Sequence, residues 1–250
     1  MRLRDGSTVR AFNGRDGEYL CTLSQTDGSS SSKPAGKGRR SAKPALALQV
    51  EQQLRSQAED SCADLDVWLL CAPIKRQRMK LLVEKATELG VTCIAPVLTA
   101  HTQEALDAEG TSRLLPIAIE AAEQCERLSL PHLHPPAPLP ELLARWHSEP
   151  HTRARQLFVC QERSPQSPPL LEALAAASAA RGVPSSAAPA AFLVGPEGGF
   201  SADEREMLAG LPWIQGVSLG ATVLRAETAA LYALSCYSSF AAAAGGSSGS

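Results

Sequence analysis

Two glycine-rich segments in the second half of the chain have the composition of ligand-binding loops. The first, residues 192–201, reads FLVGPEGGFS: an apolar strand, a glycine turn, and a Ser-x-x-Glu capping-box pattern that opens a helix. Glycines let backbone N–H groups approach a ligand, and a helix N-terminus attracts anionic groups. The segment matches neither the Gly-x-Gly-x-x-Gly nor the Walker pattern. A tight turn without a ligand fits it equally well, so alone it predicts only a possible ligand position at a strand end.

The second glycine-rich segment, residues 217–230, reads VSLGATVLRAETAA and repeats the order strand, glycine turn, helix. Arg225 and Glu227 fall at the expected helix start. A cation there opposes the helix dipole unless it meets an anion. A salt bridge from Arg225 to Glu227 or Glu197 would satisfy it, and so would a phosphate or another substrate group.

Two further segments carry charges at helical spacing. Residues 73–80 (PIKRQRMK) place four cations at an expected helix start, which is unfavourable unless phosphates or other anions bind there. Residues 120–127 (EAAEQCER) place Glu123, Gln124 and Arg127 on one helix face. A solvent-exposed face explains this second pattern equally well.

Other chemistries find little support in the sequence. The five histidines lack metal-site spacing, no Ser/His/Asp set can be placed, and Cys125 has no assignable base. We therefore expect no metal site.

The seven cysteines are scattered singly, which favours reduced thiols in an intracellular compartment. With no apolar run of about 18 residues, we expect no membrane span. A net charge of -2 and 4% aromatic residues give no general case for nucleic-acid binding.

The elements that must position these segments alternate between strands and helices from residue 64 to 240, which predicts an α/β fold with a parallel sheet covered by helices on both faces. The expected strands are 66–71, 91–98, 156–161, 190–194 and 216–219. The expected helices are 78–89, 112–126, 170–180, one from Ser201, and 226–240.

The N-terminal region has a different composition. Residues 7–12 and 18–23 read as a β-hairpin around Asn-Gly and Asp-Gly turns. Residues 26–45, rich in Ser, Gly, Pro and Lys, are expected to be disordered, as a solvated loop or an auxiliary phosphate-contacting loop. We divide the chain into a partial β-domain (1–60), an α/β domain (64–240) and a disordered tail (241–250).

Taken together, four segments resemble the RsmE family, the small-subunit rRNA uridine-N3 methyltransferases of the SPOUT superfamily. They are Lys75 with TELGVTCIAP (87–96), EQCER (123–127), VGPEGG (194–199) and LGATVLRAETA (219–229). The resemblance covers roughly residues 64–240, and residues 1–60 resemble the second half of that family's PUA-like β-barrel.

The resemblance implies a SPOUT-type parallel sheet with a C-terminal trefoil knot, whose loops would be 195–200 and 219–229. It implies a homodimer that binds S-adenosylmethionine. It also implies methyl transfer to N3 of one uridine in 16S-type rRNA within the assembled 30S-type small subunit.

Residue roles follow from the same resemblance. Backbone groups of the two loops would bind the cofactor, namely Val194, Gly195, Pro196, Glu197, Gly198, Gly199, Leu219, Gly220, Leu224, Thr228 and Ala229. Arg225 would stabilise negative charge on the uracil ring, and Glu227 would orient Arg225 or accept the proton. The expected rRNA contacts are Lys75, Arg76, Arg78 and Arg127.

The chain departs from the family pattern at three positions: Thr222 and His101 stand where the family has arginine, and Arg76 stands where it has glycine. The family also begins with about one more half-barrel, so we expect either a truncated or mis-started N-terminus or an incomplete barrel. A cytoplasmic location is expected, or a chloroplast or mitochondrion for a eukaryotic homologue. Methylation of another RNA such as tRNA, and an inactive ribosome-associated RNA-binding protein, remain the alternative functions.

Overall fold

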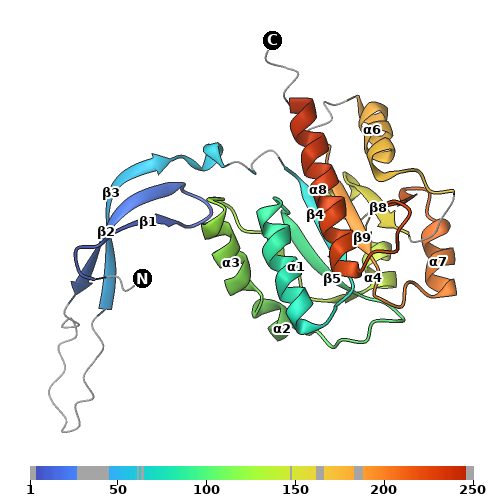
Figure 1. Cartoon of the computed structure of the whole chain (residues 1–250), viewed down its shortest axis with the longest axis horizontal. Coiled ribbons are helices and arrows are strands. Elements are labelled where there is room, and N and C mark those ends of the chain that lie inside the picture. Colours follow the sequence, from blue (N-terminus) through green and yellow to red (C-terminus); the bar gives the residue numbers. More distant parts are fainter. Residues whose placement is uncertain are drawn as a thin grey trace, which may run out of the picture. The chain divides into compact units, whose positions relative to one another are not determined.

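The structure of the protein is a computed structural model that describes residues 4–26, 45–60, 62, 65–146, 148–161, 166–182 and 188–245. The chain forms two compact units, Met1–Ala63 and Asp64–Ser250, and each is described by itself (Figure 1).

The first unit is a three-stranded antiparallel sheet in the order β1-β2-β3. Its strands are β1 (Thr8–Phe12), β2 (Glu18–Thr26) and β3 (Ala45–Arg55), followed by a short 3-10 helix, η1 (Gln57–Glu59). The expected hairpin of β1 and β2 is confirmed. Gly17 closes its turn at φ +94°, where a Cβ atom would lie 2.2 Å from the Arg55 carbonyl oxygen.

Strand β3 is not expected from the sequence, and its partner β2 lies on the far side of the Ser/Lys-rich segment. Thr26 and Ala45 pair with each other at the end of this ladder, so the disorder expected at these two residues is wrong. The remainder of that segment, residues 27–44, lies outside the described residues.

The second unit is built on a parallel sheet, as the alternation of strands and helices predicts. The strand order is β10-β8-β9-β4-β5-β6, with β7 also paired to β5, and every pairing is parallel. The strands are β4 (Val67–Cys71), β5 (Cys93–Leu98), β6 (His132–Leu133), β7 (Ala137–Pro138), β8 (Gln156–Cys160), β9 (Ala190–Val194) and β10 (Ile214–Val217).

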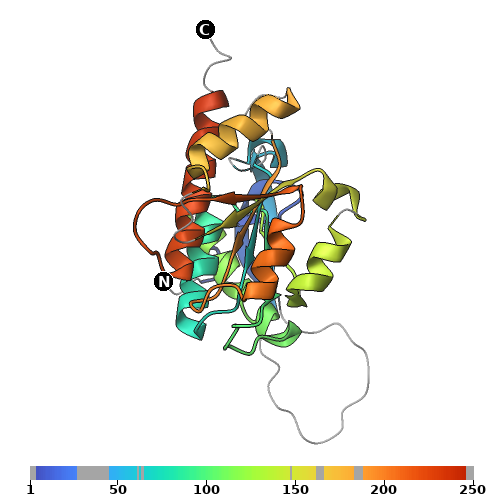
Figure 2. The same cartoon turned by 90° about the vertical axis from the view of Figure 1, so that its right-hand side faces the viewer.

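Helices cover both faces of this sheet. Figure 2 shows α1 and α8 on one side and α4 and α7 on the other. The helices are α1 (Arg76–Glu88), α2 (Ala108–Ser112), α3 (Leu115–Gln124), α4 (Leu139–Arg145), α5 (Pro150–Arg153), α6 (Leu170–Arg181), α7 (Ala202–Ala209) and α8 (Ala226–Gly245). The short elements β6, β7, α4 and α5 were not expected, because they lie in a Pro-rich stretch too short for periodicity to show.

The last helix is longer than expected. It continues to Gly245, and Ala241 is buried, so the expected disordered tail is wrong for residues 241–245. Residues 246–250 lie outside the described part of the chain.

The central strands are buried on both faces, which explains their continuous apolar composition. Neighbouring residues such as Leu69 and Leu70 on β4, or Phe192 and Leu193 on β9, point into two different core clusters. Each of these side chains is fully buried, and burial of such a side chain stabilises the fold by about 1.5–3 kcal/mol. The sheet is therefore a rigid frame for the loops that follow its strands.

Within the described residues, no helix is long and apolar enough to cross a membrane. The same part of the chain holds no group of three or more His, Cys, Asp or Glu side chains that could bind a metal ion.

Candidate active site

The two glycine-rich segments both follow strands of the parallel sheet at their carboxyl ends. The first glycine loop, residues 195–200, follows β9, and the second glycine loop, residues 218–225, follows β10. Because the strands are parallel, both loops leave the same edge of the sheet, which is the usual ligand position in such folds.

The first glycine loop is a tight turn in which the glycines are sterically required. The Gly199 N–H donates to the Pro196 carbonyl over 2.9 Å, and Gly199 has φ +67°. A Cβ atom on Gly195 would lie 3.0 Å from the Phe200 ring. At Gly199 a Cβ atom would meet no atom of the described residues within 4 Å, so these residues leave the space beside this backbone open.

A second turn, residues 99–102 after β5, packs against the first glycine loop. The His101 Nδ1 atom lies 3.1 Å from the Gly198 carbonyl oxygen and 3.0 Å from that of Gly199. Since both oxygens are acceptors, Nδ1 carries the hydrogen and donates it. In the sequence His101 is only a departure from the family pattern, and no local pattern indicates this contact.

The Glu204 carboxylate accepts hydrogen bonds from both the start of α7 and the 99–102 turn. Its Oε2 accepts from the Ser201 N–H over 2.8 Å, and the Ser201 hydroxyl accepts from the Glu204 N–H, so the predicted capping box is confirmed. Its Oε1 accepts from the Ala100 N–H over 2.7 Å. A buried carboxylate thus connects the start of α7 to the 99–102 turn. The Ser-x-x-Glu capping pattern in the sequence points to Glu204 as the residue that caps α7, but not to its contact with Ala100.

The second glycine loop turns at Gly220, which has φ +112° and open space where a Cβ atom would stand. Leu219 and Leu224 pack against the main core cluster, so this loop is anchored at both ends. Of the two expected cofactor contacts in α8, Ala229 is buried and Thr228 is exposed.

Arg78, in the first turn of α1, contacts a carboxylate from each of the two segments. Its Nη1 pairs with Glu197 Oε1 of the first glycine loop, and its Nε lies 3.5 Å from Glu227 Oε1 at the start of α8. The sequence allowed a salt bridge from Arg225 to Glu197 or Glu227. In the structure Arg78 pairs with both carboxylates instead.

Arg225 is exposed at the start of α8, and within the described residues its guanidinium makes no hydrogen bond or ion pair. The expectation that Glu227 orients Arg225 is not met, since Glu227 contacts Arg78. A cation without a partner at a helix N-terminus is electrostatically unfavourable, which favours an anionic or electron-rich ligand for Arg225.

The remaining candidate cations lie in different environments. Lys75 and Arg76 are exposed at the start of α1, where no acidic residue occupies the first turn. Arg127, in contrast, is only 1% exposed. Its Nη1 donates to the Thr87 carbonyl over 2.9 Å and its Nε to the Ser129 hydroxyl over 3.0 Å. The expected rRNA contact of Arg127 is therefore wrong, because its guanidinium holds the end of α1 inside the protein.

A separate cavity of about 140 Å³ lies between β4, β5 and the helices α4 and α5. Trp68, His134 and Trp146 are among its lining residues, and no residue of either glycine loop lines it. It is therefore not part of the candidate active site.

Comparison with known proteins identifies the family. Residues 61–238 match the model of the RNA methyltransferase domain. The chain is 30% identical over 234 residues to the ribosomal RNA small subunit methyltransferase E of Rickettsia conorii, which covers 94% of this chain and 81% of the relative. The chain belongs to the RsmE family of RNA methyltransferases.

Two solved structures have a similar fold. A putative methyltransferase from Legionella pneumophila, determined in complex with S-adenosylmethionine, is 26% identical to the protein described here and has a TM-score of 0.69 to it. The alignment covers 95% of this chain and 84% of that one. A ribosomal RNA small subunit methyltransferase E from Neisseria gonorrhoeae, 22% identical with a TM-score of 0.68, shares the fold over 95% of this chain and 84% of its own.

Proposed function

We propose that this protein transfers a methyl group from S-adenosylmethionine to N3 of one uridine in the RNA of the small ribosomal subunit. Its membership of the RsmE family and the methyltransferase names of its relatives support the reaction class. The observation that carries the proposal in this chain is the pair of glycine loops at one sheet edge. Arg225, whose side chain has no partner among the described residues, lies at the end of the second loop.

The loops suit a cofactor held by backbone groups. Gly199 and Gly220 have positive φ values and leave open space where side chains would stand, so ligand atoms can approach the main chain. Glu227 adds a buried Oε2 atom that has no hydrogen-bond partner among the described residues. When bound, the cofactor supplies an electrophilic methyl group on a sulfonium.

Methylation at N3 requires the uracil imide to give its proton to a base, either Glu227 or water, which leaves negative charge on the ring. The Arg225 guanidinium is free to donate hydrogen bonds to the uracil oxygens and to stabilise this charge. Lys75 and Arg76 are exposed at the start of α1, and in this proposal they bind RNA phosphates.

The trefoil knot belongs to the proposal as well. Its support is the path of the chain after β10, where the Ser218 N–H donates to the Pro168 carbonyl over 2.9 Å and Leu170 N–H donates to the Ser218 carbonyl over 3.1 Å. The chain thus runs along the connection between β8 and α6 before α8 returns to pack on β4 and β9.

Two further parts of the proposal concern assembly. We place β1–β3 in a PUA-like barrel, supported by Leu46, Leu48 and Val50, which alternate along β3 and are exposed. We also propose a homodimer, supported by exposed apolar side chains on the two packed helices α1 and α8, namely Leu81 and Tyr232. Light scattering of wild type and Tyr232→Glu tests the dimer: a monomeric wild type contradicts it.

Nucleoside mass spectrometry tests the reaction. Purified small subunits and bulk tRNA, both from a strain lacking the modification, are incubated with the protein and S-adenosylmethionine. We expect 3-methyluridine in the small-subunit RNA alone. Methylation of tRNA alone would favour the tRNA alternative. Absence of product together with no calorimetric binding of S-adenosylhomocysteine would favour an inactive RNA-binding protein.

A further inference from the structure

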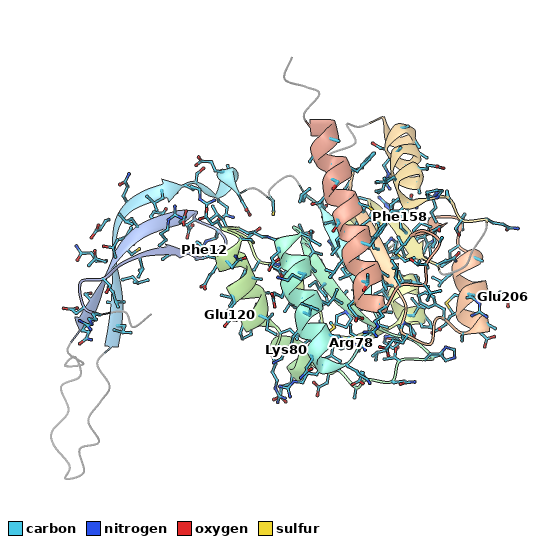
Figure 3. All side chains as sticks on the ribbon, viewed as in Figure 1. Phe12, Arg78, Lys80, Glu120, Phe158 and Glu206 are labelled. Carbon is cyan, nitrogen blue, oxygen red and sulfur yellow. The ribbon has the colours of Figure 1, made fainter. Side chains whose placement is uncertain are left out.

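Arg78 joins three segments that are far apart in the sequence. It lies in the first turn of α1, its Nη1 contacts Glu197 of the first glycine loop, and its Nε contacts Glu227 at the start of α8. Figure 3 shows Arg78 and Lys80 on opposite sides of the start of α1. Arg78 is partly buried and Lys80 is exposed, so the two cations of one helix have different surroundings.

The carboxylate of Glu227 is the most buried member of this group. Glu227 is 8% exposed, and its Oε1 faces Arg78. Its Oε2 is buried without a hydrogen-bond partner among the described residues. A buried carboxylate needs a compensating charge and a donor for each oxygen. Arg78 supplies the charge and one contact, which leaves Oε2 to accept a hydrogen bond from a ligand.

The charges of the group argue against Arg78 as a phosphate contact. One guanidinium and two carboxylates, Glu197 and Glu227, carry a formal net charge of -1. A phosphate would therefore meet a net negative cluster, and the Arg78 donors are already directed at carboxylate oxygens. Lys75 and Arg76 are exposed and have no such partners among the described residues, so they are better suited to bind RNA.

We infer that Arg78 is a positioning residue for the cofactor site. It holds Glu197 and Glu227 in one arrangement, and through them it holds the two glycine loops at the distance that the cofactor requires. The inference rests on the proposed function, because it names a residue that prepares the same site. It also replaces the RNA contact that the sequence predicted for Arg78.

Binding of S-adenosylhomocysteine in the absence of RNA separates these two roles. We expect Arg78→Gln to weaken this binding by about tenfold, equivalent to about 1.4 kcal/mol. The matched control is Lys80→Gln, which removes the same charge from the same helix. Since Lys80 is exposed, this control should bind S-adenosylhomocysteine within about twofold of wild type.

Two further measurements distinguish positioning from a general loss of stability. Arg78→Lys keeps the charge but lacks the planar fork, so we expect it to restore only part of the affinity. In a double-mutant cycle, Glu227→Gln should cost much less affinity in the Arg78→Gln background than in wild type, since the two residues act as a unit. Circular dichroism and thermal melting confirm that each variant is folded.

Unchanged S-adenosylhomocysteine affinity in Arg78→Gln, with a raised KM for the RNA substrate, would overturn the inference and restore the phosphate role. If Arg78→Gln does not fold, Arg78→Lys decides: wild-type affinity in that variant, with an additive cycle against Glu227→Gln, overturns the inference too. A wild-type protein that fails to bind S-adenosylhomocysteine would instead contradict the proposed function, so the two failures are distinguishable.

Discussion

The Nε atom of Arg78 lies 3.5 Å from Oε1 of Glu227, so the carboxylate at the start of α8 is paired with α1 rather than with its neighbour Arg225. The proximity of Arg225 and Glu227 in sequence favoured a local pair. The long-range pair leaves the Arg225 guanidinium exposed, without a partner in the described part of the chain.

Replacement of Arg225 by Ala should abolish methyl transfer while leaving S-adenosylhomocysteine binding nearly unchanged. The loss should be on the order of 100-fold or more in kcat, the range for removal of one donor to a developing negative charge. Single-turnover transfer to small subunits measures it. Arg153→Ala, an exposed arginine on α5, is the control and should retain full turnover. Wild-type kcat in Arg225→Ala would remove the proposed role.

The contact of His101 with the first glycine loop gives a second prediction. His101→Ala loses the hydrogen bonds to the Gly198 and Gly199 carbonyls and should weaken S-adenosylhomocysteine binding several-fold, since a net hydrogen bond is worth about 0.5–1.5 kcal/mol. His101→Asn places an amide N–H near the position of Nδ1 and should restore most of the affinity. Equal affinities of the two variants would show that the contact has no part in binding.

Arg127 should matter for stability and not for RNA binding. Arg127→Met leaves the Thr87 carbonyl and the Ser129 hydroxyl without this donor and should cost about 2–4 kcal/mol of unfolding free energy. The melting temperature should then fall by roughly 5–15 °C. Arg113→Met, on an exposed arginine, is the control. An unchanged melting temperature with a raised KM for RNA would support the sequence-based assignment instead.

The buried thiols of Cys71 and Cys93 predict a loss of stability in alkali. Burial raises the pKa of both thiols to about 12 from an ordinary 9.0. Between these values the unfolded chain has lost protons that the folded chain keeps, so unfolding becomes more favourable as the pH rises. Their contribution is complete below about pH 9 and is lost towards pH 12. Urea titrations between pH 7 and 11 measure the slope, and Cys93→Ala should reduce it. A slope identical in the variant would contradict this cause.

The sequence by itself determined the α/β class and most of the second unit. Strands such as β4 and β9 are continuous apolar runs because both faces are buried, and helices such as α1 show a clear apolar face, so local patterns suffice to find them. Ser201 and Glu204 likewise predict the start of α7, because a capping box is formed by residues three apart in the sequence. The two glycine loops are also predicted from local sequence, because each is a glycine turn directly after an apolar strand.

Only the tertiary structure decided which charges meet. Arg78 and Glu227 are separated by about 150 positions, and Arg127, which lies beyond the end of α3, reaches Thr87 on α1, so no periodicity could reveal either contact. The strand β3 was missed because its hydrogen bonds go to β2 across a long insertion. Burial of a guanidinium, and the pairing of a carboxylate, depend on where the packed elements place them. An arginine read from the sequence as an RNA contact can therefore be a structural residue, as Arg127 is.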